Sequence, residues 1–180
     1  MFRSDSGNWG LAARGLHWLM AAAIVGMLVL GHVMVEYPMS VTKLKLYAWH
    51  KSIGVTILAL LLIRMLWRVI DERPQLPDGM GRAARRLARL THVLLYLLML
   101  VVPLSGLLIN TASGFPLNVF GLFKIPPLMA SDEQWQLVGE WAHVIAGSVL
   151  AALVIGHVAA ALHHHFVRRD DLLKRMWRKS

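Results

Sequence analysis

Four long apolar stretches constrain this 180-residue chain more than any other feature of its sequence. They run over residues 16–35, 46–69, 87–109 and 135–166, and a membrane-spanning helix needs about 20 mainly apolar residues. Backbone groups cannot stay unpaired in hydrocarbon, and the alternation that is typical of barrel strands is missing, so the stretches are predicted to be helices. We therefore expect an all-α, integral membrane four-helix bundle that forms one domain over residues 1–180.

Charged and helix-breaking residues fit this interpretation. Hydrophobic residues make up 57% of the chain and charged residues 16%, which differs from the balance of a soluble domain. Arg64 and Arg68 near the end of the second stretch are expected to snorkel to the lipid headgroups. Pro103 is expected to kink the third helix without breaking it. The segment over residues 111–134 is predicted to be an outer loop against the membrane interface.

Basic residues predict the orientation. Of the 19 lysine and arginine residues, all but Lys43, Lys45, Lys51 and Lys124 fall on the side that holds both ends of the chain. Since cytoplasmic segments are enriched in lysine and arginine, both termini are predicted to be cytoplasmic. The basic segment over residues 82–89 is then a topology signal beside a span, and no nucleic acid partner is expected. The first stretch is expected to be a retained helix rather than a signal peptide.

Histidines within or near the spans are the candidate functional residues, because an ionisable side chain inside a bilayer is a functional hypothesis by default. They are His17, His32, His50, His92, His143 and His157. On the fourth helix, His143 and His157 are 14 positions apart, which corresponds to about 21 Å of rise and about 40° short of four full turns. They share one face at two depths.

Depth pairs these two histidines with others. His17 begins the first helix on the cytoplasmic side, level with His157, whereas His50 begins the second helix on the outer side, level with His143. Two imidazoles above and below a porphyrin fill both axial positions of the iron, which suits electron transfer. The chain has no cysteine, so a covalently attached c-type haem and thiolate-bound clusters are excluded. Two b-type haems are expected. The alternative for any one histidine is a hydrogen bond between helices.

A flat porphyrin also needs space beside its ligands. The positions four residues after the four candidate ligands hold only small residues, namely Ala21, Gly54, Gly147 and Ala161. The same positions after His92 and His32 hold Tyr96 and Glu36, which argues against ligation by those two. His92 is expected to have a hydrogen-bonding role between helices or an accessory role, such as bonding a haem propionate or quinone, and His32 is expected to be a packing or interfacial residue. The run His163, His164 and His165 is expected to be mostly solvated.

Four local motifs resemble the bacterial cytochrome b561 family, whose relatives include the cytochrome b subunits of nickel-iron hydrogenases. They are Gly15-Leu16-His17-Trp18, His50-Lys51-Ser52-Ile53-Gly54, Glu140-Trp141-Ala142-His143, and Gly156-His157 with the later run ending at Phe166. The resemblance extends over nearly the whole chain. It implies a four-helix di-haem protein of the bacterial inner membrane, with His17 paired with His157 and His50 paired with His143.

The resemblance also suggests partners. The family contains a superoxide oxidase that passes electrons from superoxide to ubiquinone, so the same oxidoreductase activity is an expectation here. The resemblance carries His164 to a position near bound quinone. Lys51 beside His50 is a candidate for attracting an anion or binding a propionate at the outer haem, or is an interfacial anchor.

Three functions therefore remain open. The leading one is a di-haem electron carrier that exchanges electrons with membrane quinone, with superoxide or a periplasmic redox protein at the outer haem. The second is a membrane-anchor cytochrome b subunit of a larger oxidoreductase complex. The third, without redox chemistry, is a small transporter that uses the histidines directly.

Overall fold

Four long helices form the molecule. The computed structural model describes residues 2–5, 7–72, 74 and 81–177. Within these ranges, four helices are long and apolar enough to cross a membrane: α1 (Leu11–Glu36), α2 (Val41–Ile70), α3 (Arg82–Ala112) and α4 (Glu133–His163), the last extended by a π-helical turn (His164–Arg168). The predicted all-α, integral membrane four-helix bundle is confirmed.

The helices begin before the apolar stretches that predicted them, and polar side chains cap two of them, α2 and α4. The Ser40 hydroxyl accepts a hydrogen bond from the backbone N–H of Lys43 at the start of α2. The Asp132 carboxylate accepts bonds from the N–H groups of Gln134 and Trp135 at the start of α4. Pro103 lies inside α3, and that helix continues through it as predicted.

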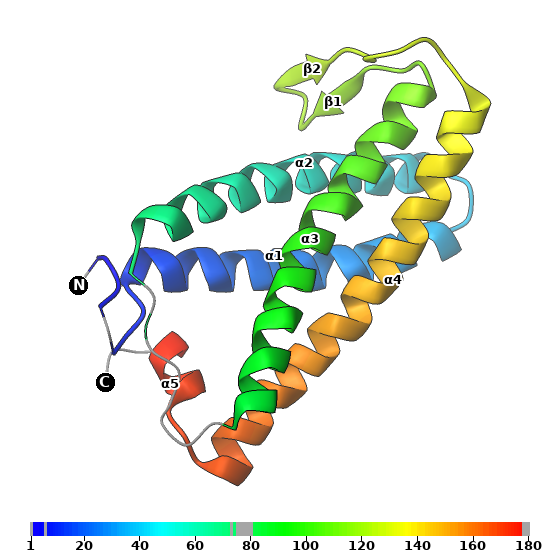
Figure 1. Cartoon of the computed structure of the whole chain (residues 1–180). Coiled ribbons are helices and arrows are strands. Elements are labelled where there is room, and N and C mark those ends of the chain that lie inside the picture. The colour runs from blue at the N-terminus through cyan, green and yellow to red at the C-terminus, as the bar shows by residue number, and fades with distance from the viewer. Residues whose placement is uncertain (1, 6, 73, 75–80, 178–180) are drawn as a thin grey trace.

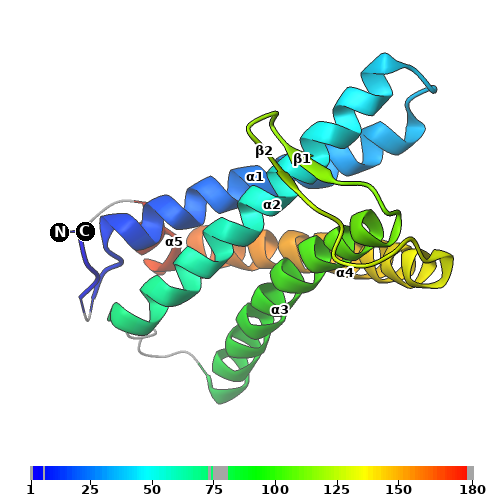
Figure 2. The ribbon, with the colours of Figure 1, turned by 90° about the horizontal axis from the view of Figure 1, so that it is seen from above.

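The helices are arranged as two helical pairs, or α-hairpins, that cross. α1 runs beside α2, α3 runs beside α4, and the axes of the two hairpins cross in Figure 1 and again in the view from above in Figure 2. Many large apolar side chains point outward, for example Leu66 and Ile155, which are 69% and 70% exposed. An outward apolar surface of this extent suits lipid rather than water.

The apolar core lies where the hairpins cross. Every one of the four helices contributes to it, and its buried members are Met20, Ile24, Ile57, Leu61, Leu95 and Leu150. Along each helix, these residues lie between the two depths of the bundle at which the candidate histidines are found. The core therefore separates one histidine level from the other.

One end of the bundle carries a small β-hairpin, and we call it the hairpin side. β1 (Leu117–Val119) pairs with β2 (Phe123–Ile125) in antiparallel register. The hairpin is attached to α2, since the Ser52 hydroxyl donates to the carbonyl of Asn118 and accepts from the N–H of Phe120. The segment predicted as an outer loop thus contains two short strands.

The opposite end carries both ends of the described chain, and we call it the termini side (Figure 1). A short helix, α5 (Leu172–Trp177), packs against the start of α1, where the Trp18 indole N–H donates to the carbonyl of Met176 at 2.9 Å. The Trp18 and Trp177 rings meet edge to face at 5.2 Å between centroids. Both chain ends are therefore held at the same end of the bundle.

The N-terminal segment is tied to the end of α2. The backbone N–H of Ser4 donates to one oxygen of the Asp71 carboxylate at 2.9 Å, and the Ser4 hydroxyl donates to the other at 2.5 Å. Burial raises the pKa of Asp71, but the hydrogen bonds from Ser4 and the charge of Arg3 outweigh it and hold the pKa below its ordinary value.

Candidate functional site

Two pairs of histidine rings face each other inside the bundle, one at each level. His17 of α1 lies opposite His157 of α4 on the termini side, with 6.3 Å between ring centroids. His50 of α2 lies opposite His143 of α4 on the hairpin side, with 6.0 Å between centroids. The structure thus brings together the residues that depth paired in the sequence.

The orientation of His143 is fixed by α3. Its Nδ1 lies 2.9 Å from the carbonyl of Val102 and 3.1 Å from the hydroxyl of Ser105. An N–H that donates from Nδ1 to a carbonyl leaves Nε2 as the free, metal-binding nitrogen of a neutral imidazole. His143 is therefore presented in the form that an iron ligand requires.

Glycines make room for both rings of the hairpin-side pair. A Cβ added at Gly106 would lie 3.4 Å from Cε1 of His143, and one added at Gly31 would lie 3.3 Å from Cε1 of His50. The distance at Gly31 is tighter than an ordinary van der Waals contact, and that at Gly106 is at the lower end of the ordinary range. His50 Nδ1 is buried and has no hydrogen-bond partner among the described residues. The His50 ring is held by close packing.

The termini-side level is more crowded and more polar. One guanidinium nitrogen of Arg64 lies 3.1 Å from Nδ1 of His17, and another donates to the Tyr96 hydroxyl at 3.0 Å. The His92 ring lies 5.6 Å from the His157 ring. Arg68 lies over the Tyr96 ring, 5.3 Å from its centroid. Arg64, which we expected to snorkel to the headgroups, instead points across the bundle.

A 14-residue interval relates the two levels on every helix. His17 and Gly31 on α1, His50 and Arg64 on α2, His92 and Gly106 on α3, and His143 and His157 on α4 are each 14 positions apart. An interval of 14 residues nearly restores the same face of a helix. Gly31, Gly106 and Arg64 were missed as site residues in the sequence analysis, and this spacing is the signal that would have found them.

The two lower-ranked candidates lie elsewhere. Lys51 follows His50 on α2, and its ammonium group donates to the Asn110 side-chain carbonyl at 2.9 Å, which links α2 to α3. His164 lies in the π-helical turn beyond α4, where its Nδ1 is 2.5 Å from a carboxylate oxygen of Asp170. Neither is part of the two ring pairs.

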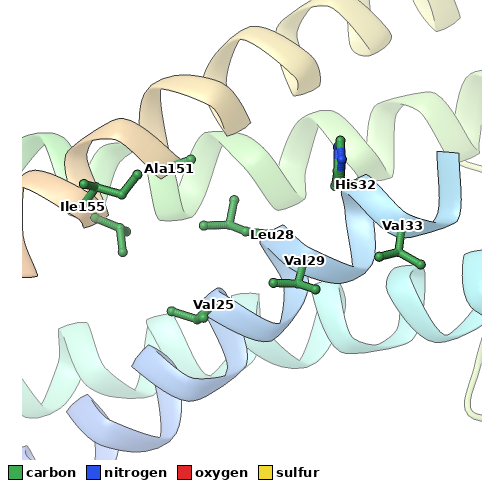
Figure 3. A pocket seen from close by; sticks show the side chains of 8 residues that line it. Val25, Leu28, Val29, His32, Val33, Ala151 and Ile155 are labelled. Atoms are coloured by element: carbon green, nitrogen blue, oxygen red, sulfur yellow. The ribbon is translucent and has the colours of Figure 1, made fainter. Parts of the chain in front are cut away.

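Open space remains beside α4. A Cβ at Gly147, one turn after His143, would meet nothing within 4 Å among the described residues. A lateral pocket of about 380 Å³ lies between α1 and α4 (Figure 3). It is apolar except for His32, and its other lining residues are Val25, Leu28, Val29, Val33, Ala151, Val154 and Ile155.

The two pairs fit haem. A histidine nitrogen binds a first-row metal ion at about 2.0–2.1 Å, so two imidazoles on opposite sides of one ion have ring centres about 6 Å apart. Both separations match this value. The hairpin-side level offers two imidazoles, and the termini-side level offers three, since the His92 ring also lies 5.6 Å from that of His157. Among the described residues, no group of three or more histidine or acidic side chains could hold a metal ion by itself, so a macrocycle would have to supply the remaining ligands. The unpartnered Nδ1 of His50 and the glycines behind the rings agree with rings held in place for a cofactor.

A four-helix membrane bundle with facing histidines at two depths has the construction of a membrane cytochrome b. The sequence comparison agrees, since the family described as prokaryotic cytochrome b561 matches residues 8–179. The chain therefore belongs to the prokaryotic cytochrome b561 family. Membership implies a b-type haem and a multi-pass membrane protein.

Named relatives cover most or all of the chain. Cytochrome b561 homolog 2 of Escherichia coli K12 is 38% identical over 99% of this chain and 96% of its own length. The probable superoxide oxidase CybB of Yersinia pestis is 30% identical over 73% of this chain and 74% of its own length. Cytochrome b561 homolog 1 of Escherichia coli K12 is 25% identical over 76% of this chain and 77% of its own length.

Proposed function

We propose that the chain holds two b-type haems and transfers electrons between membrane quinone and a donor at the opposite face. His17 and His157 bind the termini-side haem, and His50 and His143 bind the hairpin-side haem. The observation that carries this proposal is the pair of ring separations of 6.3 and 6.0 Å at two depths, with α4 contributing to both. Haem, when bound, supplies reversible one-electron chemistry at iron.

The protein's own residues hold and orient the ligands. Val102 and Ser105 accept at Nδ1 of His143 and thereby fix its ring and tautomer. Gly31 and Gly106 admit the two rings of the hairpin side. The core residues between the levels keep the two sites apart and exclude water from the region between them.

We further propose that superoxide is the donor and ubiquinone the acceptor. The termini side then faces the cytoplasm and the hairpin side the periplasm, in the bacterial inner membrane. Support comes from the name of the Yersinia pestis relative, a probable superoxide oxidase, and from Lys51, a cation that directly follows His50 on α2. A cation there attracts an anion such as superoxide. His164 is proposed to lie near bound quinone.

Optical spectroscopy of purified variants tests the ligand assignment. The wild-type protein is expected to contain about two b-type haems per chain. His50→Ala or His143→Ala should remove only the hairpin-side haem, and His17→Ala or His157→Ala only the other, because each loses an axial ligand. His92→Ala is the control and should keep both haems. Loss of a haem from His92→Ala alone would overturn the assignment.

Stopped-flow mixing tests the donor. Superoxide should reduce the wild-type haems faster than it reduces those of Lys51→Gln, and a ubiquinone analogue should reoxidise them. The absence of any reduction by superoxide in a protein that contains both haems would contradict the donor while leaving the ligand assignment intact.

A further inference from the structure

Arg64 lies at a position on α2 that corresponds to the position of the candidate ligand His157 on α4. It follows His50 by 14 residues on α2, as His157 follows His143 on α4. α2 therefore presents His50 to the hairpin-side level and Arg64 to the termini-side level on nearly the same face. Arg64 reaches His17 of α1 and Tyr96 of α3, so its side chain is directed into the bundle.

The charge of Arg64 is not matched by an acid. Among the described residues, no Asp or Glu forms an ion pair with Arg64 or with Arg68, which lies over the same Tyr96 ring. Both arginines are only half-buried in the described chain. A cation that faces the interior of a membrane bundle is costly unless an anion or a set of acceptors accompanies it. Arg64 thus has two neutral partners, His17 and Tyr96, and no anionic partner among the described residues.

The hydrogen bond between Arg64 and His17 is not compatible with iron binding by His17. A guanidinium has only donors, so Nδ1 of His17 must accept in the observed 3.1 Å contact. A neutral histidine that binds iron through Nε2 carries its proton on Nδ1, and two donors then face each other. Once His17 is a ligand, Arg64 has to exchange this nitrogen for another acceptor.

We propose that Arg64 binds a carboxylate of the termini-side haem, with Arg68 adding positive charge and the Tyr96 hydroxyl positioning the guanidinium. Haem b carries two propionate groups at its edge, and a planar guanidinium matches a carboxylate with two parallel hydrogen bonds. His17 and His157 belong to α1 and α4, so α2 and α3 flank the edges of a ring held between them. Arg64 and Tyr96 come from those flanking helices. This inference rests on the proposed haem site.

Potentiometric titration of the purified holoprotein tests the inference, with resonance Raman spectra of the haem carboxyl bending band as a second readout. Arg64→Gln should lower the midpoint potential of the termini-side haem, because a positive charge that favours the reduced iron is lost. The expected change is about tenfold in the ratio of reduced to oxidised iron, which is about 59 mV for one electron. The carboxyl bending band should shift, and Arg64→Lys should restore most of the potential.

Two controls accompany this variant. The hairpin-side haem of the same sample should be unchanged. Arg86→Gln removes the same charge from an exposed position on α3 and should leave both haems unchanged. If Arg64→Gln does not retain haem, Tyr96→Phe keeps the guanidinium but removes its 3.0 Å partner, and it should give a smaller shift in the same direction.

Each other outcome overturns the inference. A raised potential in Arg64→Gln would mean that Arg64 stabilises a deprotonated His17, and an unchanged carboxyl band would mean that no carboxylate is bound there. An unchanged potential in both Arg64→Gln and Tyr96→Phe would remove the role altogether. In all of these cases the proposed function still holds if the wild-type protein contains two bis-histidine haems. If the wild-type protein lacks them, the proposed function itself is contradicted.

Discussion

At the scale of single residues, the glycines that pack against the imidazole rings matter to the candidate site as much as the histidines do. The hairpin-side level holds two histidines and two glycines at the four equivalent positions, and the termini-side level holds three histidines and an arginine. The glycines lie against imidazole rings, so they determine where the rings can stand. The two levels also differ in charge at these positions, because the termini-side level has an arginine where the hairpin-side level has a histidine or a glycine.

Gly31→Val should disturb the hairpin-side haem. A Cβ at residue 31 would already lie 3.3 Å from Cε1 of His50, and the two further methyl groups of valine would overpack the contact at a cost of about 1–3 kcal/mol. We expect the haem content to fall from two towards one per chain, measured by the optical spectrum. Gly26→Val is the matched control, since a Cβ there meets nothing within 4 Å among the described residues. Equal haem content in the two variants would contradict the packing role.

At the scale of elements, the N-terminal segment holds the end of α2. Ser4 makes two hydrogen bonds to the Asp71 carboxylate, which is 8% exposed, and Phe2 packs edge to face on Trp67 at 5.4 Å. Arg64 and Arg68 lie in the last turns of α2, so this attachment stabilises the helix that carries them.

Asp71→Asn should therefore reduce thermal stability in detergent at neutral pH. The pKa of Asp71 is lowered in the folded protein, so its contribution is present above the ordinary value of 3.8 and is lost as the pH falls through the lower folded value. We expect a loss of about 1–3 kcal/mol at pH 7 that shrinks below about pH 4. Melting curves over this range measure it. Glu72→Gln, an exposed neighbour, should leave the curve unchanged, and equal melting of the two variants would refute the attachment.

The elements also show how far the sequence could be interpreted. Hydropathy predicted the four helices because each must cover a bilayer with apolar side chains. It could not predict β1 and β2, since three-residue strands are too short to show an alternating pattern. The inward direction of the Arg64 side chain was not predicted, because the sequence of α2 does not show which face of that helix packs against α1 and α3. The ring pairs were anticipated from depth alone, whereas their packing against Gly31 and Gly106 required the neighbouring helices.

At the scale of the whole molecule, both ends of the described chain lie on the termini side and the β-hairpin lies on the other (Figure 1). On the positive-inside rule we propose that the termini side lies in the cytoplasm. In the proposed function, this orientation decides which haem meets a periplasmic donor.

Single cysteines introduced into the cysteine-free chain test the orientation. Ser131→Cys lies exposed on the hairpin side and should react with a membrane-impermeant maleimide in intact spheroplasts. Gly81→Cys, exposed at the start of α3 on the termini side, should react only after the membrane is permeabilised. Gel mobility of the labelled protein provides the readout. The reverse labelling pattern would invert the proposed topology and, with it, the sides of donor and acceptor.

The placement of His143 and His157 on one continuous helix has a consequence for tunnelling. The rate at which an electron tunnels between two centres falls steeply with their separation, so small changes in distance have large effects. For the two haems proposed above, the along-axis component of that separation, about 21 Å between His143 and His157, is set by the pitch of α4. Because both residues belong to one α-helix, this component does not depend on the angle at which α1 and α2 cross α3 and α4.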